Sequence, residues 1–383
     1  MGPLDVELFA LAARRVLEEF PVLRIYFRDE AGVPAQFVAP PWSPLSKVMD
    51  LSCQANPMDA ALAAMRDAER RQFDPANPPL LDYQLLRLSA DKFVWHTRYH
   101  VTLTDGIGCA MIARRLAEIY NAFLHASSPR PLGIVSLEML VEDEARYLSS
   151  SRYQEDKLFW ARYLKGCVTA ILPRRAQSSA TTIVRKSLRL PGNLSAAVTA
   201  LARSTGLPVA TVLIAATYLF VHRATSVPNF HLRLVVAARE GVWRRSPVRA
   251  ANVVPLRVQI SVTDGLATIA RQVAAKLLEL RHRWRFGGPE LRLAAYETNG
   301  LMPGPSINVM SIQPISFGGN ASIIRETFPP NPTELMIRWY IGADHIRLDL
   351  AAPGSLYRHS DLARYATGFG DILTAASAIM GRS

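Results

Sequence analysis

The residues best suited to take part in a chemical reaction are a histidine and an aspartate five positions apart, with a glycine directly after the aspartate. They lie in the run from His100 to Gly106, which reads HVTLTDG. An imidazole titrates near neutral pH and can take a proton from an attacking nucleophile. An aspartate before a glycine also suits a tight turn into a helix, where its carboxylate accepts backbone N–H groups. The spacing alone does not identify a reaction, because these residue types meet by chance in many turns.

This run is predicted to lie where a strand passes into a helix. Residues 91–101 alternate like a half-buried strand, whose side chains point to opposite faces in turn. One face would carry Phe93, Trp95, Thr97, Tyr99 and Val101, and the other Val94, His96, Arg98 and His100. Residues 109–124 follow with apolar side chains at helical spacing. On this alternation, His100 and Val101 point to opposite faces unless a bulge intervenes.

Strands and helices are expected in similar proportion in both halves of the chain. In the first half we predict a helix at 5–20, a strand at 22–27, a helix at 58–73, a strand at 80–89 and one long helix at 137–164. After a polar linker at 174–182, we predict strands at 182–190 and 231–237, helices at 194–205 and 208–222, an extended segment at 250–262, a helix at 264–284, strands near 306–317 and 334–350, and a helix at 359–379. This order favours an α/β fold with a duplicated architecture, although no direct sequence repeat is visible.

Composition excludes several classes of protein. The chain has 383 residues, of which 49% are hydrophobic and 20% charged, so it can bury a sizeable core and is not intrinsically disordered. Its net charge is +12, and all but six of its 44 basic residues are arginines. We find no RNP motif, zinc-finger spacing or long basic run, so we expect no nucleic-acid partner.

The cysteines and the apolar runs indicate a cytoplasmic protein. Cys53, Cys109 and Cys167 are odd in number and far apart, which excludes a disulfide framework and a CxxC site; we expect them to be buried. The longest apolar run, 207–221, is too short to span a bilayer, and the N-terminal residues lack a signal-peptide pattern. We therefore expect no membrane partner.

Metal and phosphate motifs are also missing from the sequence. His222, His282, His345 and His359 have no carboxylate or cysteine at ligand spacing, so we predict no metal site. No GxSxG elbow occurs, and Gly318-Gly319 is too short to cradle a phosphate. We expect no bound cofactor.

The run from His100 to Gly106 resembles the HHxxxDG signature of the condensation domains of nonribosomal peptide synthetases. These domains belong to the chloramphenicol-acetyltransferase-like, CoA-dependent acyltransferase superfamily. Further segments are similar to family blocks in the family's order: 20–27 to HPxLRxxF, 153–164 to YWxxxL, Arg239 to an arginine, 251–257 to NxxPLR, and 304–309, 317–319 and 348–357 to GPxxNV, FGG and ANPxLY. The resemblance covers nearly the whole chain.

The resemblance implies two chloramphenicol-acetyltransferase-like lobes that form a V-shaped pseudo-dimer around a tunnel. The N-terminal lobe would span residues 1–170 and the C-terminal lobe 171–383. Domains of this family usually begin some tens of residues before the Leu4-Asp5 pair, so we expect this lobe to lack its first strand, or the start codon to have been assigned too late.

The resemblance also assigns roles at the centre of the tunnel. His100 aligns with the family's first histidine, and Val101 with its second, which serves as general base or positioner for the attacking amine. Valine cannot exchange a proton. Asp105 and Gly106 would be architectural, with Asp105 paired to an arginine.

Other site residues are assigned by the resemblance alone. Arg24 and Arg257 are the candidate partners of Asp105, and Asn252 belongs to the same structural set. Asn308 and Ser311 would face the tunnel and bind substrate amide or oxyanion groups, although polar residues at strand ends are often merely exposed. His96 and Arg98 are interpreted as structural.

Three interpretations of function remain open from the sequence. If active, the protein would resemble an acyltransferase that joins an acyl or aminoacyl thioester, held on the phosphopantetheine of a carrier protein, to an amine. Val101 favours a second interpretation, a non-catalytic scaffold that docks an acyl or peptidyl carrier protein or a synthetase module, or recruits a tailoring enzyme. The third is a decayed fragment. The sequence does not identify the substrates.

Overall fold

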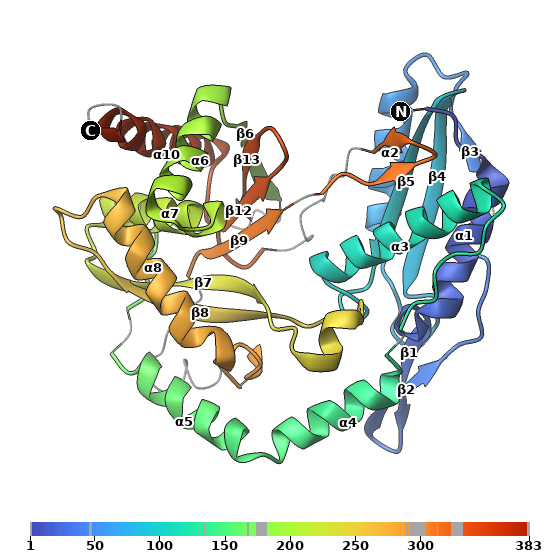
Figure 1. The fold of residues 1–383 in the computed structure, drawn as a ribbon, viewed down its shortest axis with the longest axis horizontal. Coiled ribbons are helices and arrows are strands. Elements are labelled where there is room, and N and C mark those ends of the chain that lie inside the picture. Colours follow the sequence, from blue (N-terminus) through green and yellow to red (C-terminus); the bar gives the residue numbers. More distant parts are fainter. Residues whose placement is uncertain are drawn as a thin grey trace. The chain divides into compact units, whose positions relative to one another are not determined.

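A computed structural model of the chain describes residues 2–380 apart from 46–47, 134, 167, 174–181, 289, 292–303, 312 and 323–331, and gives the backbone alone for 377–380. The chain forms two units (Figure 1). Unit 1 comprises 1–148, 239–251 and 314–324, and unit 2 comprises 149–238, 252–313 and 325–383. The predicted lobes, by contrast, are continuous segments, and their boundary at residue 170 stays a prediction.

Unit 1 is built on a small sheet in the order β3-β4-β5, with β3 parallel and β5 antiparallel to β4, and on a separate β1–β2 hairpin. Its elements are α1 (Val6–Glu19), the 3₁₀ helix η1 (Pro21–Arg24), β1 (Ile25–Glu30), β2 (Val33–Val38), β3 (Val48–Asp50), α2 (Pro57–Arg70), β4 (Leu81–Ser89), β5 (Lys92–Tyr99), α3 (Gly106–Leu124), α4 (Leu137–Leu148), η2 (Gly241–Arg245), β10 (Ser316–Phe317) and β11 (Asn320–Ala321).

The two faces of the unit 1 sheet pack against different helices. Tyr83 and Leu85 of β4 and the aromatic residues of β5 pack with the buried stripes of α1 and α3. Phe9 of α1 meets Trp95 of β5 edge to face, with ring centroids 5.5 Å apart. On the other face, Leu86 and Leu88 of β4 join Ala61 of α2 in a smaller cluster. Figure 1 shows α1 and α3 side by side along these strands.

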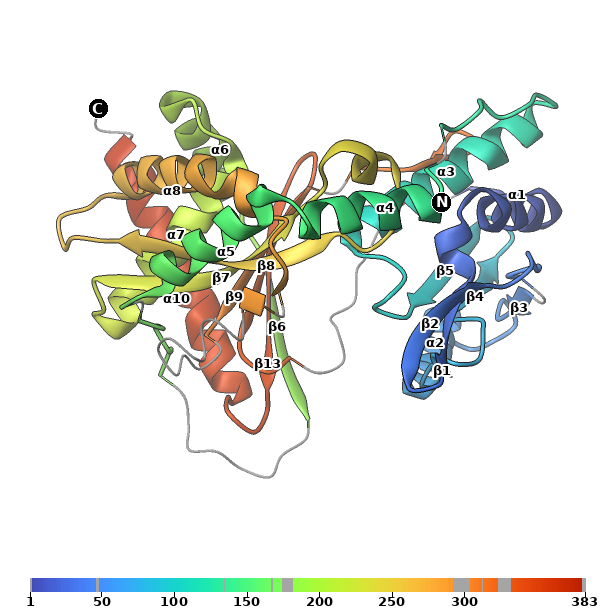
Figure 2. The same ribbon diagram turned by 90° about the horizontal axis from the view of Figure 1, so that it is seen from below.

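Unit 2 is built on a six-stranded mixed sheet in the order β6-β13-β12-β9-β7-β8. Its elements are α5 (Ser151–Leu164), β6 (Ile183–Arg189), α6 (Gly192–Thr205), α7 (Val209–Thr225), β7 (Asn229–Ala237), β8 (Ala251–Gln259), α8 (Leu266–Leu280), η3 (Arg281–Arg283), β9 (Ser306–Ser311), β12 (Met336–Ile341), β13 (Ile346–Pro353) and α10 (His359–Met380). One face of the sheet forms the main core with α7 and α10, as Figure 2 shows. α7 is buried on nearly all sides, as its uniformly apolar sequence predicts.

Three local expectations were wrong. Residues 21–24 form a 3₁₀ turn and the strand begins at Ile25, because Pro21 suits the first position of a helical turn. The long helix at 137–164 is two helices, and the hydroxyl of Ser150 caps the second by accepting from the backbone N–H of Tyr153 at 3.2 Å. Cys53 is exposed in a turn rather than buried, and Cys109 is half-buried. Cys167 and most of the predicted linker (174–181) lie outside the described residues.

Candidate active site

Strand β5 ends at Tyr99, before the histidine and valine of the motif. Phe93, Trp95 and Tyr99 lie on the face that packs against α1 and α3. The paired register ends with Tyr99 opposite Leu81. The backbone N–H of His100 still donates to the carbonyl of Leu80 at 2.8 Å, and residues 101–103 then form a turn. The prediction that Val101 shares the aromatic face is therefore wrong. That face is core.

His100 turns toward its own loop. Its Nδ1 lies 2.7 Å from the hydroxyl of Thr102 and accepts a longer hydrogen bond, 3.4 Å, from the backbone N–H of that residue. The ring also meets Phe73 edge to face, with centroids 6.3 Å apart. Burial lowers the pKa of His100, so the neutral form dominates at pH 7.

Val101 lies in the turn with 60% of its surface exposed. An apolar side chain in that position contributes little to the core, since it remains largely in contact with water. A larger polar side chain can therefore be accommodated there without displacing packed neighbours. Position 101 is open to substitution in a way that His100, tied to Thr102, is not.

Asp105 is the structural centre of the turn. Its Oδ1 accepts from the backbone N–H of Gly108 at 2.9 Å, which caps α3, and from Nη2 of Arg239 at 2.6 Å. Its Oδ2 accepts from the backbone N–H groups of Ala250 and Ala251 at 2.8 and 2.7 Å. Four donors on one shielded carboxylate make it an acceptor of fixed geometry, and its part is architectural.

Arg239 completes the network. It donates from Nη1 to the carbonyl of Ser246 at 2.9 Å and from Nη2 to that of Val248 at 2.8 Å, in addition to Asp105. The side chains of Arg239 and Asp105 are only 6% and 9% exposed. The segment 239–251 is thereby held against the β5–α3 turn within unit 1.

The predicted partners of Asp105 were wrong. Arg24 donates instead to the carbonyl oxygens of Leu17, at 2.9 Å, and Ala39. Arg257 donates to Oδ1 of Asn229 at 2.9 Å. Arg239 is the family-like arginine noted in the sequence, and that resemblance was the available signal for its role.

Sequence reasoning missed two residues that close the turn. The Thr104 hydroxyl donates to the carbonyl of Pro247 at 2.6 Å. Gly106 begins α3, three residues before the predicted start of this helix at 109, but the tighter position is Gly108, where an added Cβ would lie 2.1 Å from Oγ1 of Thr104 and 2.2 Å from that carbonyl. The motif GIG after Asp105 contained this signal, since a glycine in a helix often marks a close approach.

The remaining predicted site residues belong to unit 2. Asn252 donates from Nδ2 to the carbonyls of Trp284 and Phe286, at 2.8 and 2.6 Å, so it has a structural part there. Asn308 and Ser311 are both on β9 but, three positions apart, project from opposite faces of the sheet. Ser311 is exposed at the strand's end, whereas Asn308 is half-buried opposite Arg338.

His96 and Arg98 have the structural parts expected of them. His96 is buried beside α2, and burial lowers its pKa. Arg98 lies 3.6 Å from a carboxylate oxygen of Asp82 and over the ring of Phe73, 4.7 Å from its centroid.

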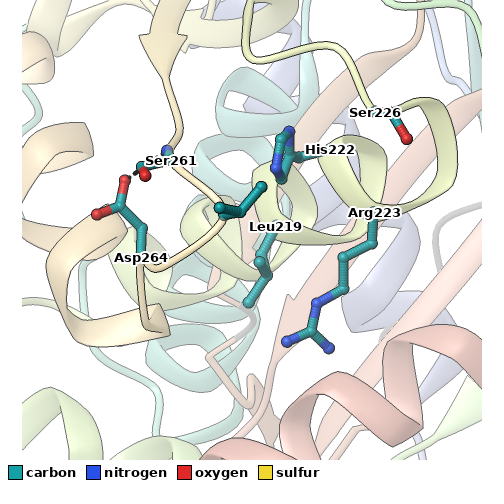
Figure 3. Close-up of a pocket in the computed structure, with 7 residues that line it drawn as sticks. Leu219, His222, Arg223, Ser226, Ser261 and Asp264 are labelled. Atoms are coloured by element: carbon teal, nitrogen blue, oxygen red, sulfur yellow. Dashed lines mark hydrogen bonds between the residues drawn. The ribbon is translucent and has the colours of Figure 1, made fainter.

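A pocket of about 260 Å³ lies at the C-terminal end of α7 (Figure 3). His222 hydrogen-bonds through Nδ1 to the carbonyl of Val227 at 2.8 Å, and the backbone N–H of Ser261 donates to Oδ2 of Asp264 at 2.8 Å. These hydrogen bonds are local: one is made at the end of α7 and the other within the loop that contains Ser261 and Asp264. They bring no nucleophile and base together.

The described residues contain no metal-binding cluster and no single membrane-spanning helix. No group of three or more His, Cys, Asp or Glu side chains there is placed to hold a metal ion. No single helix among them is long and apolar enough to cross a membrane; α6 and α7 meet that test only as a pair bent by 108°.

Comparison with known proteins identifies the family of this chain. The family model of the condensation domain matches residues 1–309. The chain belongs to the condensation domain family. The resemblance predicted from the sequence is thus confirmed, and so is the mixed α/β fold, which matches the structures of condensation domains.

Two curated relatives of this condensation domain are large synthetases. The chain is 29% identical to an isonitrile lipopeptide synthase of Streptomyces coeruleorubidus, over the whole chain and 26% of that protein. It is 27% identical to a dimodular nonribosomal peptide synthase of Bacillus subtilis, over 98% of the chain and 16% of that protein. The condensation domain therefore spans about a quarter or less of these relatives.

A solved relative covers the fold almost completely. It is a doubly substituted variant of the starter condensation domain of rhizomide synthetase, in complex with C8-CoA and Leu-SNAC. The match has a TM-score of 0.88 and 26% identity, and covers 98% of this chain and 87% of the other. The first condensation domain of the calcium-dependent antibiotic synthetase, with a substrate analogue, has a TM-score of 0.85 at 25% identity, covering 98% and 89%.

Proposed function

We propose that this condensation domain acts in nonribosomal peptide biosynthesis by joining a carrier-bound acyl or aminoacyl thioester to an amine. The amine nitrogen forms a bond to the thioester carbonyl carbon, and the carbon–sulfur bond breaks. The sulfur of the phosphopantetheine arm leaves as a thiolate and takes up the proton that the amine loses. The reaction is downhill, so the protein's contribution is to hold two reactants together.

One observation carries this proposal. The β5–α3 turn is built in full around Asp105 and Arg239, although position 101 has a valine. A base at the reaction centre typically contributes about 10²- to 10⁴-fold, whereas positioning alone contributes several kcal/mol of barrier lowering. We therefore expect slow condensation that depends on the positioning of the two reactants alone. His100 does not act as the base, because its Nδ1 is engaged by the hydroxyl of Thr102.

A second candidate function is a non-catalytic scaffold that docks carrier proteins or recruits a tailoring enzyme. The observation in its favour is Val101 itself, because a valine supplies no proton acceptor. Both candidates need an acyl or peptidyl carrier protein, or the synthetase module that bears it, as partner. We also place the protein in the cytoplasm, since the exposed free thiol of Cys53 is typical of a reducing compartment.

A single-turnover assay separates the two candidates. The chain is mixed with an acyl-loaded carrier and an amine-bearing carrier, and the amide product is measured by mass spectrometry. Amide formation above the protein-free rate supports condensation. Carrier binding without amide formation supports the scaffold, and the lack of both contradicts both candidates.

A further inference from the structure

The pocket at the end of α7 lies wholly within unit 2, between the last turn of this helix and the loop that joins β8 to α8 (Figure 3). Its volume of about 260 Å³ equals that of roughly eight or nine water molecules, at about 30 Å³ each. The backbone N–H of Ile260 donates to the carbonyl of Pro228 at 2.7 Å and so ties the loop to the residues that follow α7. The pocket is therefore pre-formed, which is typical of sites for small molecules.

A buried histidine presents an unused acceptor to this pocket. His222 is only 8% exposed, and its Nδ1 donates to the carbonyl of Val227 at 2.8 Å, because a carbonyl oxygen can only accept. Its Nε2 makes no hydrogen bond within the described residues and is not one of their unpaired atoms that are shielded from water. Since His222 lines the pocket, Nε2 meets solvent there. The neutral ring thus offers a lone pair to an N–H or O–H donor.

Two opposite charges border the same pocket without forming an ion pair. The exposed side chain of Arg223 has no hydrogen bond or ion pair in the part of the chain that the structure describes. Asp264 accepts through Oδ2 from the backbone N–H of Ser261 at 2.8 Å and from Nε2 of Gln272 at 3.5 Å, and its Oδ1 has no partner among those residues. A ligand that carries both charges can bridge the two side chains. A simple anion or cation would instead meet one charge of its own sign.

Ser226 adds a hydroxyl to the pocket from a strained backbone position. It ends α7 in the left-handed region, at φ 58°, where α6 ends with a glycine, Gly206 at φ 67°. Glycine adopts this conformation without the steric penalty that a Cβ brings. The hydroxyl of Ser226 makes no hydrogen bond within the described ranges. A strained residue with a free polar group is typical of a functional site.

We propose that this pocket binds the zwitterion of a small aliphatic amino acid. The carboxylate pairs with Arg223, whose guanidinium can form two parallel hydrogen bonds, and accepts from the hydroxyl of Ser226. The ammonium group donates to Oδ1 of Asp264 and Nε2 of His222, and the aliphatic side chain lies against Leu219. The reaction turn belongs to unit 1 and this pocket to unit 2, so the inference goes beyond the proposed function and does not depend on it.

The test is a calorimetric titration of the full chain with L-valine, isobutylamine and isovalerate. The last two have the carbon skeleton of valine but only its ammonium or only its carboxylate group. We expect valine to bind at least about tenfold more tightly than either, since each lacks one charge-assisted contact. Arg223→Gln should remove the preference for valine over isobutylamine. The matched control is Arg203→Gln, also exposed in the last turn of a helix, and it should keep the preference.

Ser226→Gly separates a binding role from a structural one. It should raise the thermal midpoint, because glycine relieves the strained φ, and yet weaken valine binding about threefold or more through loss of the hydroxyl. Titration of the unsubstituted chain without saturable heat for valine would overturn the proposal, and so would equal affinity for the three probes or unchanged affinity in Ser226→Gly. No carrier or thioester is present, so failure here leaves the proposed function standing, and failure of the amide assay leaves this site standing.

Discussion

Arg239 donates a 2.6 Å hydrogen bond to Asp105 across 134 positions of the sequence. The same carboxylate caps α3 through the backbone N–H of Gly108, so one side chain fixes both the helix start and the position of the segment 239–251. His100 and Val101 lie in the turn that leads into this cap. The geometry of any reaction at this turn therefore depends on the Asp105–Arg239 pair.

Asp105→Ala should destabilise the fold strongly. It leaves the guanidinium of Arg239 buried without its counter-ion, and breaking such a pair costs about 3–5 kcal/mol. The measurement is the free energy of unfolding in urea. As a control, Arg14→Gln removes an exposed ion pair with Glu18 and should change it by about 0.5 kcal/mol or less. A loss below about 1 kcal/mol for Asp105→Ala would contradict the architectural part given to this residue.

Gly108→Ala should destabilise the fold more than the addition of a single methyl group would suggest. The added Cβ would lie within 2.2 Å of Oγ1 of Thr104 and the carbonyl of Pro247, so that the Thr104–Pro247 hydrogen bond must open. Overpacking of this kind costs about 1–3 kcal/mol. Gly192→Ala is the matched control, because it is also helical and its Cβ would meet nothing within 4 Å. Comparable thermal midpoints for the two variants would show that the close approach is relieved at no cost.

Periodicity predicted the helices and strands well where the pattern is long. The apolar run of α7 and the alternation of β5 both correspond to real elements. The alternation continues through His100 and Val101, but strand β5 ends at Tyr99. His100 makes one more cross-strand hydrogen bond, from its backbone N–H to the carbonyl of Leu80 at 2.8 Å, and the chain then turns at 101–103. A side-chain pattern cannot show where a partner strand begins.

Sequence patterns could not predict the partner of Asp105 either, for a different reason. No local rule relates residues 134 positions apart, and Arg24, Arg239 and Arg257 are equally plausible as lone arginines. The structure selects Arg239 because η2 and the following residues return the chain to the turn, where Ser246 and Val248 bind the same guanidinium.

Acid should destabilise unit 2 through His231. This imidazole is buried on β7 and donates from Nδ1 to the carbonyl of Val168 at 3.1 Å, and burial lowers its pKa to about 4. The unfolded chain, with a pKa near 6.5, binds the proton first. The stabilisation is therefore complete above about pH 6.5 and is lost as the pH falls toward 4, by up to about 3 kcal/mol.

The measurement is urea unfolding between pH 4 and 7.5. His231→Gln should flatten the loss between pH 6.5 and 4, while His125→Gln, at an exposed position after α3, should leave the profile as it is. An unchanged acid slope in His231→Gln would assign the effect to other groups.

Carrier binding should weaken as salt rises. The chain carries a net charge of +12 and carrier proteins are usually acidic, so charge attraction is expected to lead the association. Exposed charges are screened over about 10 Å at 0.1 M salt and about 3 Å at 1 M. Titration of a holo carrier at low and high salt measures this, and an affinity independent of salt would exclude a charge-led interface.

Val101→His should turn a positioning domain into a more effective catalyst. The side chain at 101 is 60% exposed in the turn, so an imidazole can be placed there without repacking the core. If the rest of the site is intact, it supplies the missing base, and condensation of a carrier-bound thioester with its amine should rise at least about tenfold, a floor below the usual contribution of general-base catalysis.

His100→Ala is the matched comparison, one position away. Because His100 contacts Thr102 and Phe73, its loss should act on the local fold, measured as a lower thermal midpoint, and leave the rate of the remaining folded protein within a few-fold. If instead the unsubstituted protein proves fully active and His100→Ala abolishes turnover at an unchanged midpoint, His100 is the base. The turn would then rearrange when substrate binds, breaking the contact between Nδ1 of His100 and Thr102.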